Sequence, residues 1–387
     1  MVLYLLKPGE LYLKGGNRDD FVRILSRNLA LMLRETKARI NVRHGRFYVD
    51  CPDAAAAEAE DVFGRLFGIT GWARARKVDK TTGAVVAACV EEGKAAWEAG
   101  ARTFRIEARR ADKRFPLNSQ GICVEAGDAV LGAVPGFKAK MTGADAVIHV
   151  EIRENAYIYG GEHAGLRGLP AGTAGRGMLL LSGGIDSPVA GFLMAGRGMR
   201  LDAVYFHAPP YTGDDALHKV ERLAEIIGRY ALAVRLHVVS FTEVEQRIKN
   251  GAPAAWNTVL LRMAMMETAE KIARRRRCKC LVTGESLSQV ASQTVENIAC
   301  TGSVVTLPVF RPLIGMDKEA ITRIACQIGT YPVSILPYED CCVLFSPEHP
   351  ILYGDPDEAL RLYRRLELPS AVKSFGGGTA DEWNMDH

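Results

Sequence analysis

Hydrophobic positions follow two different patterns on either side of a glycine-rich stretch at residues 160–177. Ahead of this stretch, apolar residues at a spacing of three to four predict helices over 18–34 and 81–99, because that spacing places them on one helical face. Strands are predicted at 46–49, 103–108 and 147–152. Helices and strands in these proportions favour small α+β layers, and the glycines themselves favour a linker.

Behind the linker, short strands rich in apolar residues, the first of them a continuous apolar run, alternate with amphipathic helices. The strands are predicted at 177–181, 203–206, 234–239 and 280–283, and the helices from 188, over 214–230 and over 253–277. Apolar strands separated by helices are typical of a parallel sheet that is covered on both faces. We therefore predict a doubly wound α/β domain over residues 177–370. The remaining residues, 371–387, are predicted to form a flexible tail.

Composition narrows the class of protein. A chain of 387 residues predicts two or three domains, and 48% hydrophobic with 24% charged residues excludes intrinsic disorder for most of it. No window approaches the roughly 18 apolar residues of a membrane span, and the first residues do not resemble a secretory signal. The nine cysteines have no regular spacing, which predicts reduced thiols and argues against a metal site. We expect a cytoplasmic protein that does not contact membranes.

The segment Ser-Gly-Gly-Ile-Asp-Ser at residues 182–187 carries the clearest chemical signal, because it follows the first strand of the α/β domain and opens a helix. Two glycines let the backbone turn tightly, so that N–H groups, hydroxyls and the helix N-terminus converge on an anion. Asp186 would repel a phosphate unless a divalent cation lay between them, so it predicts Mg²⁺. The alternative is a capped turn that binds nothing.

This loop matches the SGGxDS motif of the PP-loop ATP pyrophosphatases, which split ATP between the α and β phosphates. Residues 9–18, 279–297 and 308–349 resemble the 4-thiouridine synthetase family of tRNA sulfurtransferases, of the thiamine biosynthesis protein I type. The resemblance covers about residues 9–350. It implies the following domains: a ferredoxin-like domain over 1–59, a THUMP RNA-binding domain over 60–165, a linker over 166–176 and a PP-loop ATP pyrophosphatase domain over 177–370.

Two features depart from the longer family members. Pro8 stands where the family usually has a Tyr-Gly-Glu start. The chain also leaves no room for the rhodanese domain that longer members append, so we expect the short form of the family.

The resemblance implies ATP as a cofactor and assigns its contacts to the α/β domain. The implied positions are Leu180, Leu181, Ser182, Gly183, Gly184, Ser187, Tyr205, Phe206, Arg262, Gly284 and Gln293. Asp186 is the implied magnesium ligand, and Lys318 is implied to neutralise charge during adenylation. From the sequence alone, Arg262 could equally be a solvated charge, Gly284 an ordinary turn glycine and Lys318 part of a capped surface helix.

Charge and resemblance together point to RNA in the first half of the chain. The formal net charge is +4, and the basic excess lies in the first 175 residues, which weakly favours a polyanion surface. The resemblance implies that tRNA binds at Lys14, Arg18, Arg109, Arg110, Lys113 and Arg114, with Phe115 beside the last four. The run Arg274–Arg277 stays open between a helix end and a phosphate contact.

Among the cysteines, Cys89, Cys123, Cys300 and Cys326 have apolar neighbours and are predicted to be core residues. Cys341 matches the family position that pairs with the rhodanese cysteine of longer members, which implies that it relays sulfur. Cys342 could resolve the intermediate, and the alternative for both is an inert structural pair.

The implied reaction forms 4-thiouridine at position 8 of tRNA. ATP adenylates the uridine O4, and persulfide sulfur from a cysteine desulfurase displaces AMP. The alternatives are another PP-loop ligase or amidotransferase, and a catalytically silent tRNA-binding protein. The identity of the desulfurase, a role in thiamine thiazole synthesis and the oligomeric state, a homodimer included, stay open.

Overall fold

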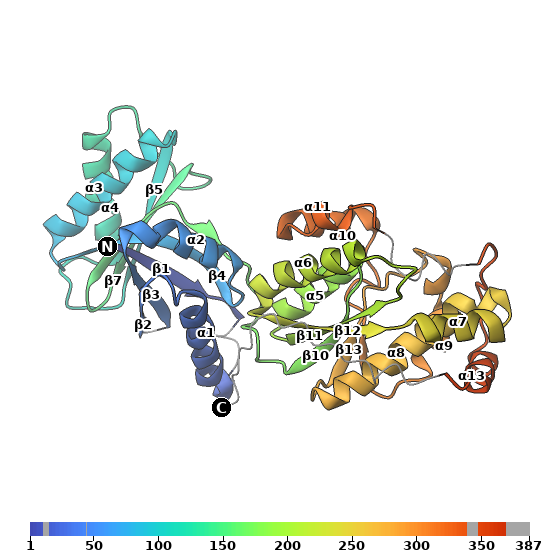
Figure 1. Ribbon diagram of the computed structural model, residues 1–387. Coiled ribbons are helices and arrows are strands. Elements are labelled where there is room, and N and C mark those ends of the chain that lie inside the picture. Colours follow the sequence, from blue (N-terminus) through green and yellow to red (C-terminus); the bar gives the residue numbers. More distant parts are fainter. Residues whose placement is uncertain (11–14, 44, 339–346, 369–387) are drawn as a thin grey trace. The chain divides into compact units, whose positions relative to one another are not determined.

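The computed structural model describes residues 1–10, 15–43, 45–338 and 347–368. They form two compact units, residues 1–169 and the chain from Pro170 onward, each with its own sheet (Figure 1). Lys14, Cys341, Cys342 and residues 371–387 lie outside the described residues, so what the sequence predicts for them stays a prediction.

The first unit is built on a mixed sheet with the strand order β2-β3-β1-β4-β8-β7-β5-β6, and β9 pairs with β4. The strands are β1 (Val2–Pro8), β2 (Arg39–Arg43), β3 (Arg46–Cys51), β4 (Ile69–Val78), β5 (Thr103–Arg110), β6 (Lys138–Ala139), β7 (Ala146–Ile152), β8 (Ala156–Tyr159) and β9 (His163–Ala164). The helices are α1 (Arg18–Met32), α2 (Ala56–Arg65), α3 (Thr82–Glu98) and α4 (Ser119–Ala133).

Strand β4 is shared by two hydrophobic cores. Its residues 69–75 pair with β1, and its residues 76–78 pair with β8. Trp72 packs against Tyr4 and Phe63 in the first core, whereas the second core gathers side chains of α3, α4 and β5. Helix α2 and most of β4 therefore pack with the first core, although the boundary expected from the sequence lies at residue 60.

The second unit contains an all-parallel sheet with the strand order β12-β11-β10-β13-β14. The strands are β10 (Arg176–Leu180), β11 (Arg200–His207), β12 (Val234–Ser240), β13 (Cys280–Val282) and β14 (Val309–Phe310). From β10 the chain builds outward to β12 and then crosses to β13 on the other side of β10. This confirms the predicted doubly wound α/β fold, and its topological switch point lies at the carboxyl end of β10.

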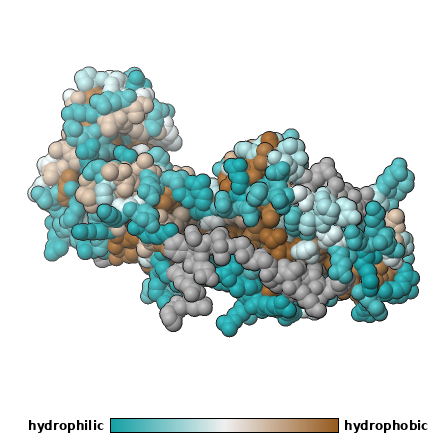
Figure 2. Space-filling model, viewed as in Figure 1, coloured by the Kyte–Doolittle hydropathy of each residue, from teal (hydrophilic) through white to brown (hydrophobic). Residues whose placement is uncertain are grey.

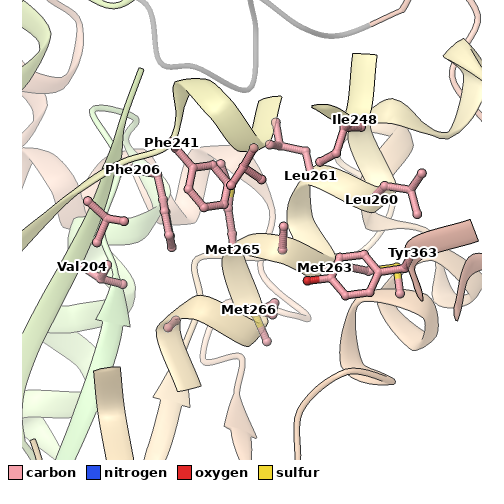
Figure 3. Close-up of a cluster of buried hydrophobic side chains, with 14 of the residues drawn as sticks. Val204, Phe206, Phe241, Ile248, Leu260, Leu261, Met263, Met265, Met266 and Tyr363 are labelled. Carbon is pink, nitrogen blue, oxygen red and sulfur yellow. The ribbon is translucent and has the colours of Figure 1, made fainter. Parts of the chain in front are cut away.

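Helices cover both faces of this sheet (Figure 1). They are α5 (Asp186–Gly196), α6 (Asp214–Ala231), α7 (Thr242–Gly251), α8 (Asn257–Arg275), α9 (Val295–Gly302), α10 (Lys318–Ile328), α11 (Tyr331–Ser334) and α13 (Pro356–Arg365). Successive strand residues face opposite sides, so Leu179 contacts Gly191 of α5 while Met178 joins the core under α8. Figure 3 shows that core, where Val204 and Phe206 of β11 meet Phe241 and the methionines of α8.

The visible face of each unit is mainly hydrophilic, with apolar residues in patches (Figure 2). No helix in the described part of the chain has the length and hydrophobicity to cross a membrane.

Candidate nucleotide and RNA sites

The loop that joins β10 to α5 is closed by its own two serines. The backbone N–H of Ser182 donates to Oγ of Ser187 (2.9 Å), and the two hydroxyl oxygens lie 3.1 Å apart. Ser334 of α11 ties the loop to the domain, because its hydroxyl donates to the carbonyl of Gly184 (3.1 Å). No described side chain caps the first N–H groups of α5. A helix N-terminus of this kind favours an anion, and the switch point places it where ligands bind in such sheets.

Gly284 contacts the first turn of α5. A Cβ atom at this position would lie 2.7 Å from the Ser187 nitrogen and 2.9 Å from the Asp186 carbonyl carbon. The end of β13 can therefore pack against the loop only because residue 284 has no side chain. Gly284 is one of the nucleotide positions implied by the resemblance, whereas its close contact in the structure is with the loop backbone.

Asp186 and Lys318 meet beside the loop, although 132 residues separate them in sequence. The Lys318 Nζ lies 2.7 Å from the Asp186 carboxylate, and the Gln289 side chain donates to the other oxygen (3.0 Å). The side chain of Asp317 caps α10 by accepting from the Ala320 N–H, which fixes Lys318 as the first residue of that helix. Lys318 is thus part of a capped helix and also a partner of Asp186. Gln289 was not identified from the sequence, because nothing in its surroundings marks it as a contact.

Arg262 belongs to a buried ion-pair network rather than to solvent. Its guanidinium lies 2.5 Å from the Glu285 carboxylate, and Arg311 lies 2.6 Å from the other oxygen, which also accepts from Thr283 (2.8 Å). Burial opposes ionisation of Glu285, but the two arginine charges outweigh it and hold the pKa of this carboxyl below its usual value. Glu285 and Arg311 were not identified from the sequence, because only the fold reveals their pairing.

The remaining nucleotide positions lie at the same edge of the sheet. Leu181, Tyr205 and Phe206 are buried, and the Leu181 N–H donates to the Val204 carbonyl (2.9 Å). Gln293 is 7% exposed, and its side-chain oxygen is buried without a hydrogen-bond partner among the described residues. A buried acceptor without a donor is costly, so this oxygen is suited to a donor from a ligand such as the adenine amino group.

In the predicted RNA cluster at 109–114, two of the four cations have hydrogen-bond partners within the protein. Arg110 donates to the carbonyls of Lys113 and Phe115, and Arg114 shares the Asp112 carboxylate with Lys80. Hydrogen bonds from Arg114 and Lys80 lower the pKa of Asp112 strongly.

Two side chains of this cluster, Arg109 and Lys113, are exposed and have no acidic partner in the described part of the chain. Arg18 is half-buried at the start of α1.

Two expectations about individual residues were wrong. Phe115 is 5% exposed and packs in the second core of the first unit, so it does not offer a ring to bases. Cys326 is exposed on α10 rather than buried, because the apolar residues beside it in sequence lie on the inner face of the helix.

The donor set for a metal is small. No group of three or more His, Cys, Asp or Glu side chains suited to a metal ion occurs among the described residues. Asp186 is a single carboxylate, and magnesium is commonly held by one or two carboxylates together with substrate phosphates. Asp186 therefore fits magnesium only as a ligand shared with a nucleotide.

Comparison with known proteins identifies the family. The model of the thiamine biosynthesis protein (ThiI) matches residues 172–368, that of the ThiI ferredoxin-like domain matches 3–73, and that of the THUMP domain matches 80–159. A "Probable tRNA sulfurtransferase" of Treponema pallidum (strain Nichols) is 50% identical over 94% of this chain and 92% of its own length. One from Caldanaerobacter subterraneus is 43% identical over 96% of this chain and 97% of its own.

A solved structure agrees with these sequence matches. The crystal structure of a 4-thiouridine synthetase–RNA complex with bound ATP is similar with a TM-score of 0.89 and 34% identity, covering 96% of this chain and 97% of that one. The chain therefore belongs to the thiamine biosynthesis protein (ThiI) family.

Proposed function

We propose that this protein is an ATP-dependent tRNA sulfurtransferase that converts uridine 8 of tRNA to 4-thiouridine. The observation that carries the proposal is the loop at 182–187, where Asp186 and Lys318 meet at the switch point of the sheet. The solved relative with bound ATP and RNA supports it, because it aligns over nearly the whole chain.

ATP would bind with its phosphates on the loop. The N–H groups at the start of α5 and the hydroxyls of Ser182 and Ser187 would donate to the phosphate oxygens, and the Gln293 oxygen would accept from the adenine. Asp186 would hold magnesium together with those phosphates, and the ion would supply charge neutralisation to the triphosphate.

Lys318 would stabilise the negative charge that develops when the uridine O4 attacks the α-phosphorus and pyrophosphate leaves. Its ammonium already lies 2.7 Å from Asp186, so it stands at the loop without a large rearrangement. Sulfur delivered as a persulfide then bonds to C4 of the base, and AMP leaves with the former O4. Cys341 is proposed to carry that persulfide, and a second thiol, for which Cys342 is the candidate, then breaks the remaining S–S bond and forms a disulfide.

The tRNA would contact the first unit through exposed cations. Arg109 and Lys113 are the strongest candidates in the cluster, because Arg110 and Arg114 have partners within the protein. A cysteine desulfurase is the proposed persulfide donor. The described cysteines are free thiols, which supports a reducing, cytoplasmic location.

The test is analysis of tRNA from cells that lack the gene. Loss of 4-thiouridine, restored by the wild-type gene but not by Asp186→Asn, is the expected result. Retention of 4-thiouridine in the deletion strain would contradict the proposal and leave a ligase or a silent tRNA-binding protein.

A further inference from the structure

A basic hollow lies on the second unit where α8 ends and β13 begins. It has a volume of about 340 Å³ and is lined by Arg274, Arg277, Cys278, Lys279 and Leu307. Because β10 and β13 are parallel and Cys280 pairs with Gly177, the hollow lies at the amino edge of the sheet. The nucleotide loop follows the carboxyl ends of the same strands, so the hollow is separate from the site described above.

Positive charge is concentrated there without matching negative charge. Residues 274–279 contain four arginines and one lysine. Arg274 pairs with Glu270 (2.7 Å), and Arg276 pairs with Asp202 (3.0 Å). Arg275, Arg277 and Lys279 are exposed and have no acidic partner in the part of the chain that the structure describes. None of the residues that line the hollow is acidic.

The end of a helix explains only part of this run. Cations favour the last turn of a helix because of its macrodipole, and Arg274 and Arg275 lie in the last turn of α8. Arg277 and Lys279 lie beyond the end of the helix, and each lies close to other positive charges of the run 274–279. Their shared position around one hollow therefore requires another reason.

Arg277 also occupies a backbone position that suits glycine. Its φ is 57°, in the left-handed region. The Cys278 N–H donates to the Ala273 carbonyl (2.8 Å), and the Arg277 N–H donates to that of Arg274 (3.1 Å). This is the Schellman pattern, in which the left-handed residue is usually glycine because a Cβ is unfavourable there. The chain keeps an arginine at a position where its side chain costs backbone stability.

We propose that Arg277 and Lys279 bind backbone phosphates of the tRNA substrate, and that Arg274, whose charge Glu270 already shares, contributes its remaining N–H donors. Glu270 and the Thr306 hydroxyl hold the Arg274 guanidinium, at 2.7 and 2.5 Å, so its planar donors are fixed before the RNA arrives. Phosphate contacts of this kind position an RNA without reading its sequence. The inference rests on the proposed function in one respect, namely that the substrate is tRNA.

The backbone strain at Arg277 makes the test specific. Arg277→Gly removes the charge and relieves the left-handed Cβ, so the full-length variant should unfold at the wild-type temperature or above it. Its tRNA affinity at physiological salt should fall about 5-fold, and the slope of log affinity against log salt should become shallower by about 1. Arg277→Gly combined with Lys279→Gln should lower the slope by about 2. Thermal unfolding and filter binding of tRNA at several salt concentrations provide these values.

Arg275→Gln is the matched control, because Arg275 is an exposed arginine of the same run that does not line the hollow. It should leave the slope within about 0.3 of the wild type. Wild-type affinity and slope in the double variant would overturn the proposal. So would normal tRNA binding with loss of desulfurase-driven thiolation, which would indicate an acidic protein partner instead. Failure of the wild-type protein itself to bind tRNA would contradict the proposed function, not this site alone.

Discussion

Asp186 is the single carboxylate on which the proposed adenylation depends most directly. Replacing it with alanine removes the proposed magnesium ligand and the partner of Lys318. We expect pyrophosphate release to fall by about 100-fold or more, while tRNA affinity stays nearly unchanged. Both quantities should be measured on one preparation.

Asp215→Ala is the matched control, since Asp215 is an exposed aspartate in the first turn of the neighbouring helix α6. It should keep both activities. Wild-type pyrophosphate release in Asp186→Ala would exclude the metal-bridging role.

Glu285 tests how much the buried ion-pair network contributes to the stability of the fold. Glu285→Gln leaves Arg262 and Arg311 without their carboxylate, and the cost of breaking such a pair is about 3–5 kcal/mol of unfolding free energy. Urea denaturation at neutral pH measures this loss.

The pH dependence follows from the lowered pKa of Glu285. The stabilisation of the folded state by ionised Glu285 is fully present above the ordinary glutamate pKa of about 4.3. It is lost as the pH falls through the lower pKa that Glu285 has in the folded protein. The difference between wild type and Glu285→Gln should therefore shrink only below about pH 4. A constant difference down to the acid transition would argue against a charged Glu285.

At the scale of elements, the contact between β13 and α5 is the tightest constraint on the nucleotide loop. Gly284→Ala places a Cβ 2.7 Å from the Ser187 nitrogen, so the first turn of α5 must move. We expect a loss of about 1–3 kcal/mol in unfolding free energy and weaker ATP binding, measured by denaturation and calorimetry. Gly302→Ala in α9 is the control, because a Cβ there meets no atom within 4 Å. Equal ATP affinity in both variants would show that the loop tolerates the shift.

The sequence was sufficient for elements with a strong hydrophobic pattern. Strands β10 to β13 were located because each contains a short segment rich in apolar residues, and α1 and α3 because their apolar spacing is helical. The two-residue β14 was missed, since its neighbours rather than its own pattern define it. Helix α4 was missed as well, because small and glycine residues obscure its apolar face.

The candidate site was predicted where a motif marks it and not where pairing creates it. The loop at 182–187 and Lys318 came from motifs, and the structure brings Asp186 and Lys318 together. Gln289, Glu285 and Arg311 acquire their roles only through contacts between distant segments. Phe115 was grouped with the basic cluster because its neighbours in sequence are cationic, and the sequence does not show that its ring is buried.

At the scale of the whole molecule, tRNA binding should depend on several weak phosphate contacts. Replacing Arg109 and Lys113 with glutamine removes two exposed cations of the first unit, so affinity should fall and the salt slope should become shallower by about 2. Arg114→Gln should have a smaller effect, because Asp112 already shares that charge. An unchanged slope in the double variant would place the RNA surface elsewhere.

Sulfur delivery is the other property that belongs to the whole molecule. Cys341→Ser should abolish thiolation with desulfurase as donor but retain pyrophosphate release, and free sulfide should restore the product if Cys341 only relays sulfur. Cys326→Ser is the control, because Cys326 is an exposed thiol of the same unit. Full desulfurase-driven activity in Cys341→Ser would leave direct attack by the donor's persulfide.

The sharing of β4 by two cores limits how this part of the gene can recombine. A crossover within codons 69–78 would join the first part of β4 from one relative, which pairs with β1, to the last part of β4 from another, which pairs with β8. Hybrids between relatives should survive best when the junction falls at residues 79–81, in the short connection between β4 and α3. The ferredoxin-like and THUMP modules should therefore recombine with β4 kept whole, even though each has a core of its own.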